Sequence, residues 1–287
     1  MMALKRTCYL VVAALGVVLT TAVGSWALYV ESNPVPLFGT DDILQAGANF
    51  QATFNGNVLE LMVTLTNVAP ETFGDDGLGD ATSVPSSVLT GVFFTLTDKS
   101  GNDVVLDPMS ALLGGSTVYF GADGGGNVGG EWAYAGGLSG APRGATSGIS
   151  SSGLDLFGAA NFNGVDLDPP GAVNGLNYGI VSANDDLTLG NAKVTGGVPL
   201  IQDSVTFSLT ASLADYDFNS PGQVLDKISN ISFQYGTSLS QPNLPGDGSL
   251  PPLNVVPEPA TILLLGTGLL GVGGMARRRK TAAKQEG

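Results

Sequence analysis

An acidic segment in the second half of the chain has the residue types and the spacing that suit calcium binding. Asp215, Asp217, Asn219 and Asp226 occupy positions 1, 3, 5 and 12 of a twelve-residue stretch. EF-hand loops bind Ca²⁺ through oxygen ligands at these positions. Position 6, normally Gly, is Ser220, and position 12 is Asp in place of Glu. The segment therefore has two interpretations, a Ca²⁺ site and an Asx-rich turn between strands, of which the turn is the commoner.

Two further acidic clusters, residues 75–80 (DDGLGD) and 166–168 (DLD), allow the same two interpretations. Paired carboxyl groups could also hydrolyse a glycosidic bond, which requires a separation of about 5 to 10 Å and one raised pKa. The chain contains 25 Asp and Glu, so the sequence nominates no particular pair. We therefore expect a protein that is not an enzyme.

Absent residue types exclude most other catalytic chemistry. The chain has no His and a single Cys, Cys8, which lies in the N-terminal apolar run. Ser-His-Asp and Cys-His arrangements and ordinary zinc or copper sites are therefore excluded. Without a second Cys there is no disulfide, so core packing alone must stabilise the fold.

Trp132 and Tyr134 are the aromatic pair of interest, because residues two apart share one face of a strand. If exposed, they would form a platform that stacks on a sugar ring, as in carbohydrate-binding modules. Burial in the core is the commoner arrangement. Their exposure distinguishes the two interpretations.

Negative charge dominates the central part of the chain. Between residues 28 and 256, twenty-three Asp and Glu accompany four cations, Lys99, Arg143, Lys193 and Lys227. Such a surface repels nucleic acid and anionic lipid, so we expect neither as a partner.

Alternating apolar and polar residues predict strands after residue 28. Every second side chain is apolar in residues 58–66 and again in residues 203–213. Asn55-Gly56 separates residues 49–54 from 58–66 and predicts a hairpin with a type I′ turn. Further strands are predicted at residues 88–97, 103–106, 116–120, 131–135, 178–182 and 228–235, and no amphipathic helix is predicted.

Many short strands separated by Gly, Asn, Asp and Pro favour an all-β fold, namely an antiparallel β-sandwich or jelly-roll-like domain with Gly-rich loops. We assign this domain to residues 28–238. Residues 239–256 are rich in Pro and predict an extended linker.

The N-terminus has the pattern of a signal peptide over residues 1–27. Lys5 and Arg6 precede an apolar run at residues 7–22, and Ser25-Trp26-Ala27 offers small residues at −3 and −1. The sequence predicts entry into the Sec export machinery and cleavage by signal peptidase after Ala27.

The C-terminus has three parts. Pro257-Glu258-Pro259 is held in an extended form by its prolines. Residues 261–276 are uncharged, and as a helix they would span about 24 Å, less than the hydrocarbon core of about 30 Å. Arg277, Arg278, Arg279 and Lys280 follow and should stay cytoplasmic, as should the tail at residues 281–287.

This tail resembles the PEP-CTERM sorting signal of Gram-negative bacteria, in which Pro-Glu-Pro precedes a transmembrane segment and a basic cluster. The resemblance implies that the membrane peptidase exosortase recognises residues 257–280 and removes them, so that the C-terminal helix contacts the membrane only transiently. Blocks such as residues 130–134 and 148–153 also resemble parts of one group of exosortase-dependent surface proteins. That group is associated with exopolysaccharide, which is thereby implied as a partner.

Three functions are consistent with these features. The first is an exported, non-enzymatic protein of the cell surface or extracellular matrix that exosortase processes. The second is a carbohydrate-binding or sugar-active domain that uses the same sorting route. The third is a permanently anchored inner-membrane protein that faces the periplasm.

Overall fold

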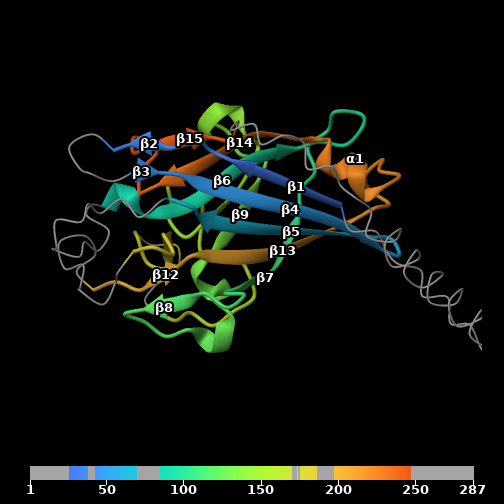
Figure 1. The fold of residues 1–287 in the computed structure, drawn as a ribbon. Helices are drawn as coiled ribbons and strands as arrows, with labels where there is room; N and C mark the ends of the chain where they lie inside the picture. Colours follow the sequence, from blue (N-terminus) through green and yellow to red (C-terminus); the bar gives the residue numbers. More distant parts are fainter. Residues whose placement is uncertain are drawn as a thin grey trace, which may run out of the picture. The chain divides into compact units, whose positions relative to one another are not determined.

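Two β-sheets are the main elements of the computed structural model, which describes residues 26–37, 43–69, 85–169, 173, 175–185 and 197–246 (Figure 1). The five-stranded sheet has the order β1-β4-β5-β13-β7. Its strands are β1 (Trp26–Glu31), β4 (Ala46–Asn55), β5 (Val58–Asn67), β13 (Ser204–Ser212) and β7 (Asp107–Leu112). All of its neighbouring strands are antiparallel.

The eight-stranded sheet has the order β15-β14-β6-β11-β12-β8, with β10 pairing with β6 and β9 pairing with β10. Its strands are β15 (Asn243–Pro245), β14 (Ile228–Tyr235), β6 (Leu89–Leu96), β11 (Gly179–Val181), β12 (Leu200–Gln202), β8 (Thr117–Tyr119), β10 (Ser147–Ser150) and β9 (Ala133–Gly136). Only the β11–β12 pair is parallel among its described pairs. The predicted all-β, mainly antiparallel fold is confirmed.

Short elements complete the described chain. β2 (Val35–Pro36) and β3 (Ile43–Leu44) form a two-stranded ladder. The helical turns are η1 (Pro85–Ser87), η2 (Gly124–Gly126), η3 (Gly129–Glu131), η4 (Pro142–Gly144) and the one-turn helix α1 (Pro221–Leu225). No helix in the described part of the chain is long and apolar enough to cross a membrane.

The β4–β5 hairpin follows from the sequence pattern, with one correction to its turn. Strand pairing ends at Asn55 and Val58, so the central turn residues are Gly56 and Asn57. Gly56 has a φ of 60°, whereas Asn57 does not have a positive φ. A positive φ at the first central residue alone, with Gly there, is typical of a type II′ turn, so the predicted type I′ turn is wrong.

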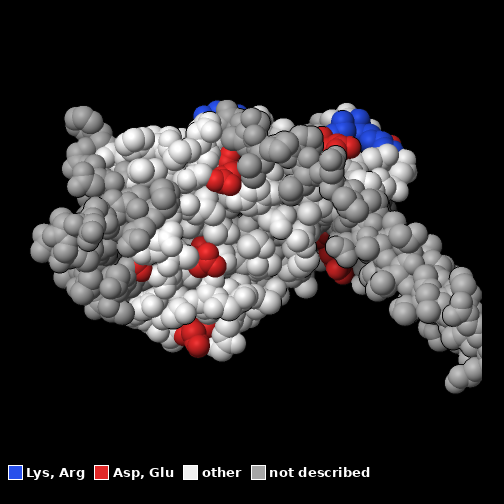
Figure 2. Space-filling model, viewed as in Figure 1, with Lys and Arg blue, Asp and Glu red and all other residues white. Residues whose placement is uncertain are grey.

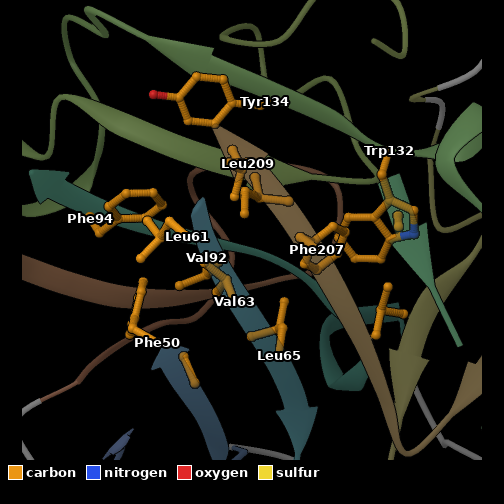
Figure 3. Packing of buried hydrophobic residues seen from close by; sticks show 14 of the residues in the cluster. Phe50, Leu61, Val63, Leu65, Val92, Phe94, Trp132, Tyr134, Phe207 and Leu209 are labelled. Carbon is orange, nitrogen blue, oxygen red and sulfur yellow. The ribbon is translucent and has the colours of Figure 1, made fainter. Parts of the chain in front are cut away.

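The apolar faces of both sheets meet in one core (Figure 3). Leu61 and Val63 of β5 pack in this cluster with Val92 and Phe94 of the other sheet. The ring of Phe50 meets that of Phe94 edge-on, with centroids 5.5 Å apart. A strand buries every second residue, and β5 and β13 therefore each contribute one complete face to the core.

The predicted strand at residues 103–106 is wrong. Asp103 makes only an isolated bridge to Thr97, and the next strand, β7, begins at Asp107. Val104 and Leu106 are nevertheless buried in the core. The apolar alternation was thus a signal of burial in a connecting segment and not of strand pairing.

The body extends beyond both predicted boundaries. β1 begins at Trp26, inside the predicted signal peptide, and β15 lies inside the predicted linker, where it pairs with β14. Proline is tolerated in an edge strand because its missing N–H faces away from the ladder. After β15, the Gly246 N–H donates to the Ile231 carbonyl at 2.9 Å. A Cβ at Gly246 would lie 2.9 Å from Val30 Cγ1, so this end of the body adjoins β1.

Candidate functional site

Trp132 and Tyr134 are core residues, with 0 % and 5 % of their surface exposed. The Trp132 ring lies 4.9 Å from the Phe207 ring, centroid to centroid. The Tyr134 hydroxyl accepts from the Leu106 N–H at 3.2 Å and lies 3.3 Å from Ser147 Oγ. The exposed sugar-stacking platform considered for these residues is therefore not formed.

The acidic segment at residues 215–226 folds as a capped helical turn. Ser220 is the N-cap of α1, and its hydroxyl accepts from the Gln223 N–H. Asp217 forms an exposed ion pair with Lys99 at 3.5 Å. Asp226 is the C-cap of α1.

Ser220, one of the two residues that depart from the calcium-loop pattern, is thus the N-cap of α1. Across the described ranges, no group of three or more acidic side chains could hold a metal ion. Calcium binding by Asp215, Asp217, Asn219 and Asp226 stays a prediction. A shift in melting temperature at millimolar Ca²⁺ would support it, and no heat in a calorimetric titration would reject it. Residues 75–80 lie outside the described residues.

One carboxylate that sequence reasoning did not single out is almost fully buried. Glu131, 2 % exposed, ends η3. Its Oε1 accepts from the Leu167 N–H at 2.5 Å and the Asp168 N–H at 3.2 Å. Burial raises the pKa of the Glu131 carboxyl, while the two N–H donors act in the opposite direction.

Glu131 thereby connects η3 to the acidic segment at residues 166–168. The two backbones touch here, because a Cβ at Gly130 would lie 2.0 Å from the Val165 carbonyl oxygen. Catalytic acids also have a raised pKa. In Glu131, however, one carboxylate oxygen already accepts hydrogen bonds from two backbone N–H groups, which is a structural role. In the sequence, this Glu follows two glycines and precedes a Trp. These neighbours alone do not predict that its side chain is buried.

The outward face of the five-stranded sheet carries mainly neutral polar side chains along its three middle strands. We name it the hydroxyl face, and it comprises the outward side chains in the middle of β4, β5 and β13, at residues 49–53, 60–66 and 204–210. These are Asn49, Gln51, Thr53, Glu60, Met62, Thr64, Thr66, Ser204, Thr206, Ser208 and Thr210. Nine of the eleven are neutral and polar, and this alternation was visible in the sequence.

Register aligns these side chains in rows across the strands. Asn49, Thr64 and Thr206 form one row, and the Thr64 and Thr206 hydroxyls are 2.9 Å apart. Gln51, Met62 and Ser208 form the next. Figure 2 shows that carboxylates are scattered singly over the visible surface of the described body, with the cations near the top of the view. The hydroxyl face itself carries one charge, that of Glu60.

The predicted processing residues fall at and beyond the ends of the body. Ala27 lies in β1 and pairs with Gln51. Pro257, Glu258, Pro259, Arg277, Arg278 and Arg279 lie outside the described residues, as does the predicted helix at residues 261–276.

Residues 255–280 match the model of the PEP-CTERM protein-sorting motif. The chain carries this sorting motif. The PEP-CTERM match includes all six predicted processing residues of the tail. The motif marks substrates of exosortase and implies export across the inner membrane. No curated protein and no solved structure matches the chain.

Proposed function

We propose that this chain is an exported, non-enzymatic protein that exosortase releases from the membrane to the cell surface or extracellular matrix. The observation that carries the proposal is the PEP-CTERM motif at residues 255–280. The signal-peptide pattern of residues 1–27 supports the same route from the other end of the chain.

The chemistry of the tail explains why it serves as a temporary anchor. Pro257 and Pro259 favour an extended peptide that a protease can bind. The apolar run at residues 261–276 contains five Gly, which weaken a helix. The run is also shorter than the hydrocarbon core, while Arg277 and its basic neighbours hold the C-terminus on the cytoplasmic side.

Cleavage is tested by intact-mass measurement of the exported protein in a bacterium that has exosortase, with an exosortase deletion strain beside it. We expect the released protein to lack Arg277 to Arg279 and the deletion strain to retain the full tail in its membranes. The double variant Pro257→Ala/Pro259→Ala should be retained likewise. Pro251→Ala, in the adjoining segment but outside the motif, is the matched control and should be released. Recovery of exterior protein that still carries Arg277 to Arg279 would reject the proposal, and full-length protein in wild-type membranes would favour permanent anchoring.

The matrix partner that we propose is a neutral exopolysaccharide, which would lie on the hydroxyl face. A polysaccharide without charge presents hydroxyl donors and acceptors, and the neutral polar side chains of this face, carried by strands about 4.8 Å apart, supply matching groups. The net negative charge of the chain disfavours anionic polysaccharides. Binding of such a polysaccharide requires no catalytic carboxylate. The proposed function therefore differs from that of a sugar-active enzyme.

Sedimentation with insoluble cellulose, compared with alginate beads, tests this contact. We expect the purified exported protein to sediment with the neutral polymer and not with the polyanion. Thr206→Glu, which places a charge in the middle of the face, should lower the bound fraction at least about threefold. Ser100→Glu, in an exposed turn that is not part of the hydroxyl face, should leave it unchanged. Equal binding by both variants would reject the hydroxyl face as the contact surface.

A further inference from the structure

The first strand uses residues that cleavage after Ala27 would remove. β1 spans Trp26–Glu31 and pairs with β4 along its whole length. Trp26 is opposite Ala52, and Ala27 is opposite Gln51. A cut after Ala27 would shorten this six-residue strand to four residues and place a charged amine on Leu28, which packs against the core.

Trp26 also covers the helical turn α1. A Cβ at Gly222 would lie 3.2 Å from Cε3 and 3.3 Å from Cδ2 of Trp26, so the indole ring rests on the backbone of α1. Trp26 is 41 % exposed, and more than half of its surface is therefore covered by the fold. A side chain that packs in this way contributes to the mature protein and has no equivalent use in a discarded leader.

The leader contains a second cleavage pattern upstream of β1. Its apolar run can end at Leu19, which leaves Thr20 to Gly24 as a short segment of small and polar residues. Ala22 and Gly24 then stand at −3 and −1, which are the positions where signal peptidase requires small side chains. The sequence alone permits both bonds, but only the upstream bond leaves β1 whole.

We infer that signal peptidase hydrolyses the Gly24–Ser25 bond, so that the mature protein begins at Ser25. Water adds across this peptide bond, giving a carboxylate on Gly24 and an ammonium group on Ser25. The inference rests on the proposed export of the chain. It differs from the sequence-based prediction by three residues, all of which then belong to the mature body.

The N-terminal peptide of the exported full chain, identified by mass spectrometry, tests this inference. We expect a peptide that begins at Ser25, and one that begins at Leu28 or Val23 would overturn it. Gly24→Leu, which puts a large residue at −1, should lower the amount of the peptide that begins at Ser25 at least tenfold. Ala27→Leu, the matched change at the alternative bond, should leave that amount unchanged. The same digest reports the peptides beyond Pro257, so a failure of C-terminal processing is seen separately from a wrong N-terminal bond.

A stability measurement checks the structural premise. In the exported protein, Trp26→Ala should lower the melting temperature by about 2–4 °C, because a lost packing contribution of about 1 kcal/mol shifts a body of this size by that amount. Trp26→Phe keeps an aromatic ring on α1 and should lose less. An unchanged melting temperature for Trp26→Ala would show that Trp26 is not part of the folded body and would overturn the inference.

Discussion

At the scale of single residues, Glu131 joins two distant parts of the chain through one carboxylate oxygen. Its partners, the N–H groups of Leu167 and Asp168, come from a loop that the sequence marked only as an acidic cluster. Buried donors and acceptors are almost always paired, because an unpaired group costs its full desolvation energy. Glu131→Ala should therefore lower the free energy of unfolding by about 1–3 kcal/mol, measured by urea denaturation.

Glu131 also makes stability depend on pH. Burial raises its pKa in the folded state above the ordinary 4.5. At a pH between the ordinary pKa and the raised pKa, Glu131 holds a proton in the folded state that it has released in the unfolded chain. The contribution of Glu131 to stability therefore falls as pH rises through this window. Glu131→Gln removes the titration while an amide oxygen can still accept from both N–H groups. The difference in unfolding free energy between wild type and Glu131→Gln should therefore decrease from low to neutral pH, and parallel curves would contradict this.

Gly130 is required by the same contact between η3 and the 166–168 segment. An added Cβ would overlap the Val165 carbonyl, which is backbone and cannot move without shifting its neighbours. Gly130→Ala should cost about 1–3 kcal/mol of unfolding free energy, the range typical of overpacked interiors. Gly158→Ala is the control, because nothing lies within 4 Å of its Cβ position. Equal stabilities of the two variants would show that the backbones are not in contact.

At the scale of elements, the β4–β5 hairpin depends on one left-handed residue. Gly56, with φ of 60°, has open space around its Cβ position, so a substitution there is opposed by backbone conformation and not by a clash. Gly56→Ala should destabilise the protein by about 1–2 kcal/mol, the cost of the left-handed conformation for a residue with a side chain. Thermal unfolding followed by circular dichroism measures this. No loss would mean that the turn can adopt another geometry.

Sequence pattern predicted the strands whose burial alternates and some others, but it missed strands whose pairing depends on distant partners. Burial alternates along β5 and β13, and β14 is found at its predicted residues although its burial does not alternate. β10, with the sequence SGIS, has no such period, and all four of its residues are buried by β6, β9 and the segments around them. The parallel β11–β12 pair brings together residues about twenty apart, which no local pattern reveals.

The candidate sites likewise divide into one that local sequence predicts and others that depend on residues far away in the chain. The tail motif depends on order and composition within one short stretch, and it was predicted in full from sequence. Whether Trp132 and Tyr134 are exposed depends on Phe207 and on the covering loops, so sequence left it open. The burial of Glu131 depends on a loop some 36 residues away in the chain and could not be predicted.

At the scale of the whole molecule, negative charge is poorly compensated. Among the described residues there is one ion pair, between Lys99 and Asp217, and it is exposed. Mutual repulsion of the carboxylates is screened by salt, with a Debye length of about 30 Å at 0.01 M and about 8 Å at 0.15 M. The melting temperature should therefore rise by a few degrees between these ionic strengths. Differential scanning calorimetry at both measures this, and a fall would point to stabilising charge pairs in place of repulsion.

The neighbouring positions of β1 and Gly246 bear on the order of events during secretion. Val30 and Gly246 touch, and Trp26 is four residues before Val30, so the entry and exit of the folded body lie roughly 13 Å apart along one strand at about 3.3 Å per residue. In the proposed export route, such closely spaced ends would let the two sheets pack while the leader and the tail still hold the chain at one bilayer. Folding would then not depend on the order of the two proposed cuts.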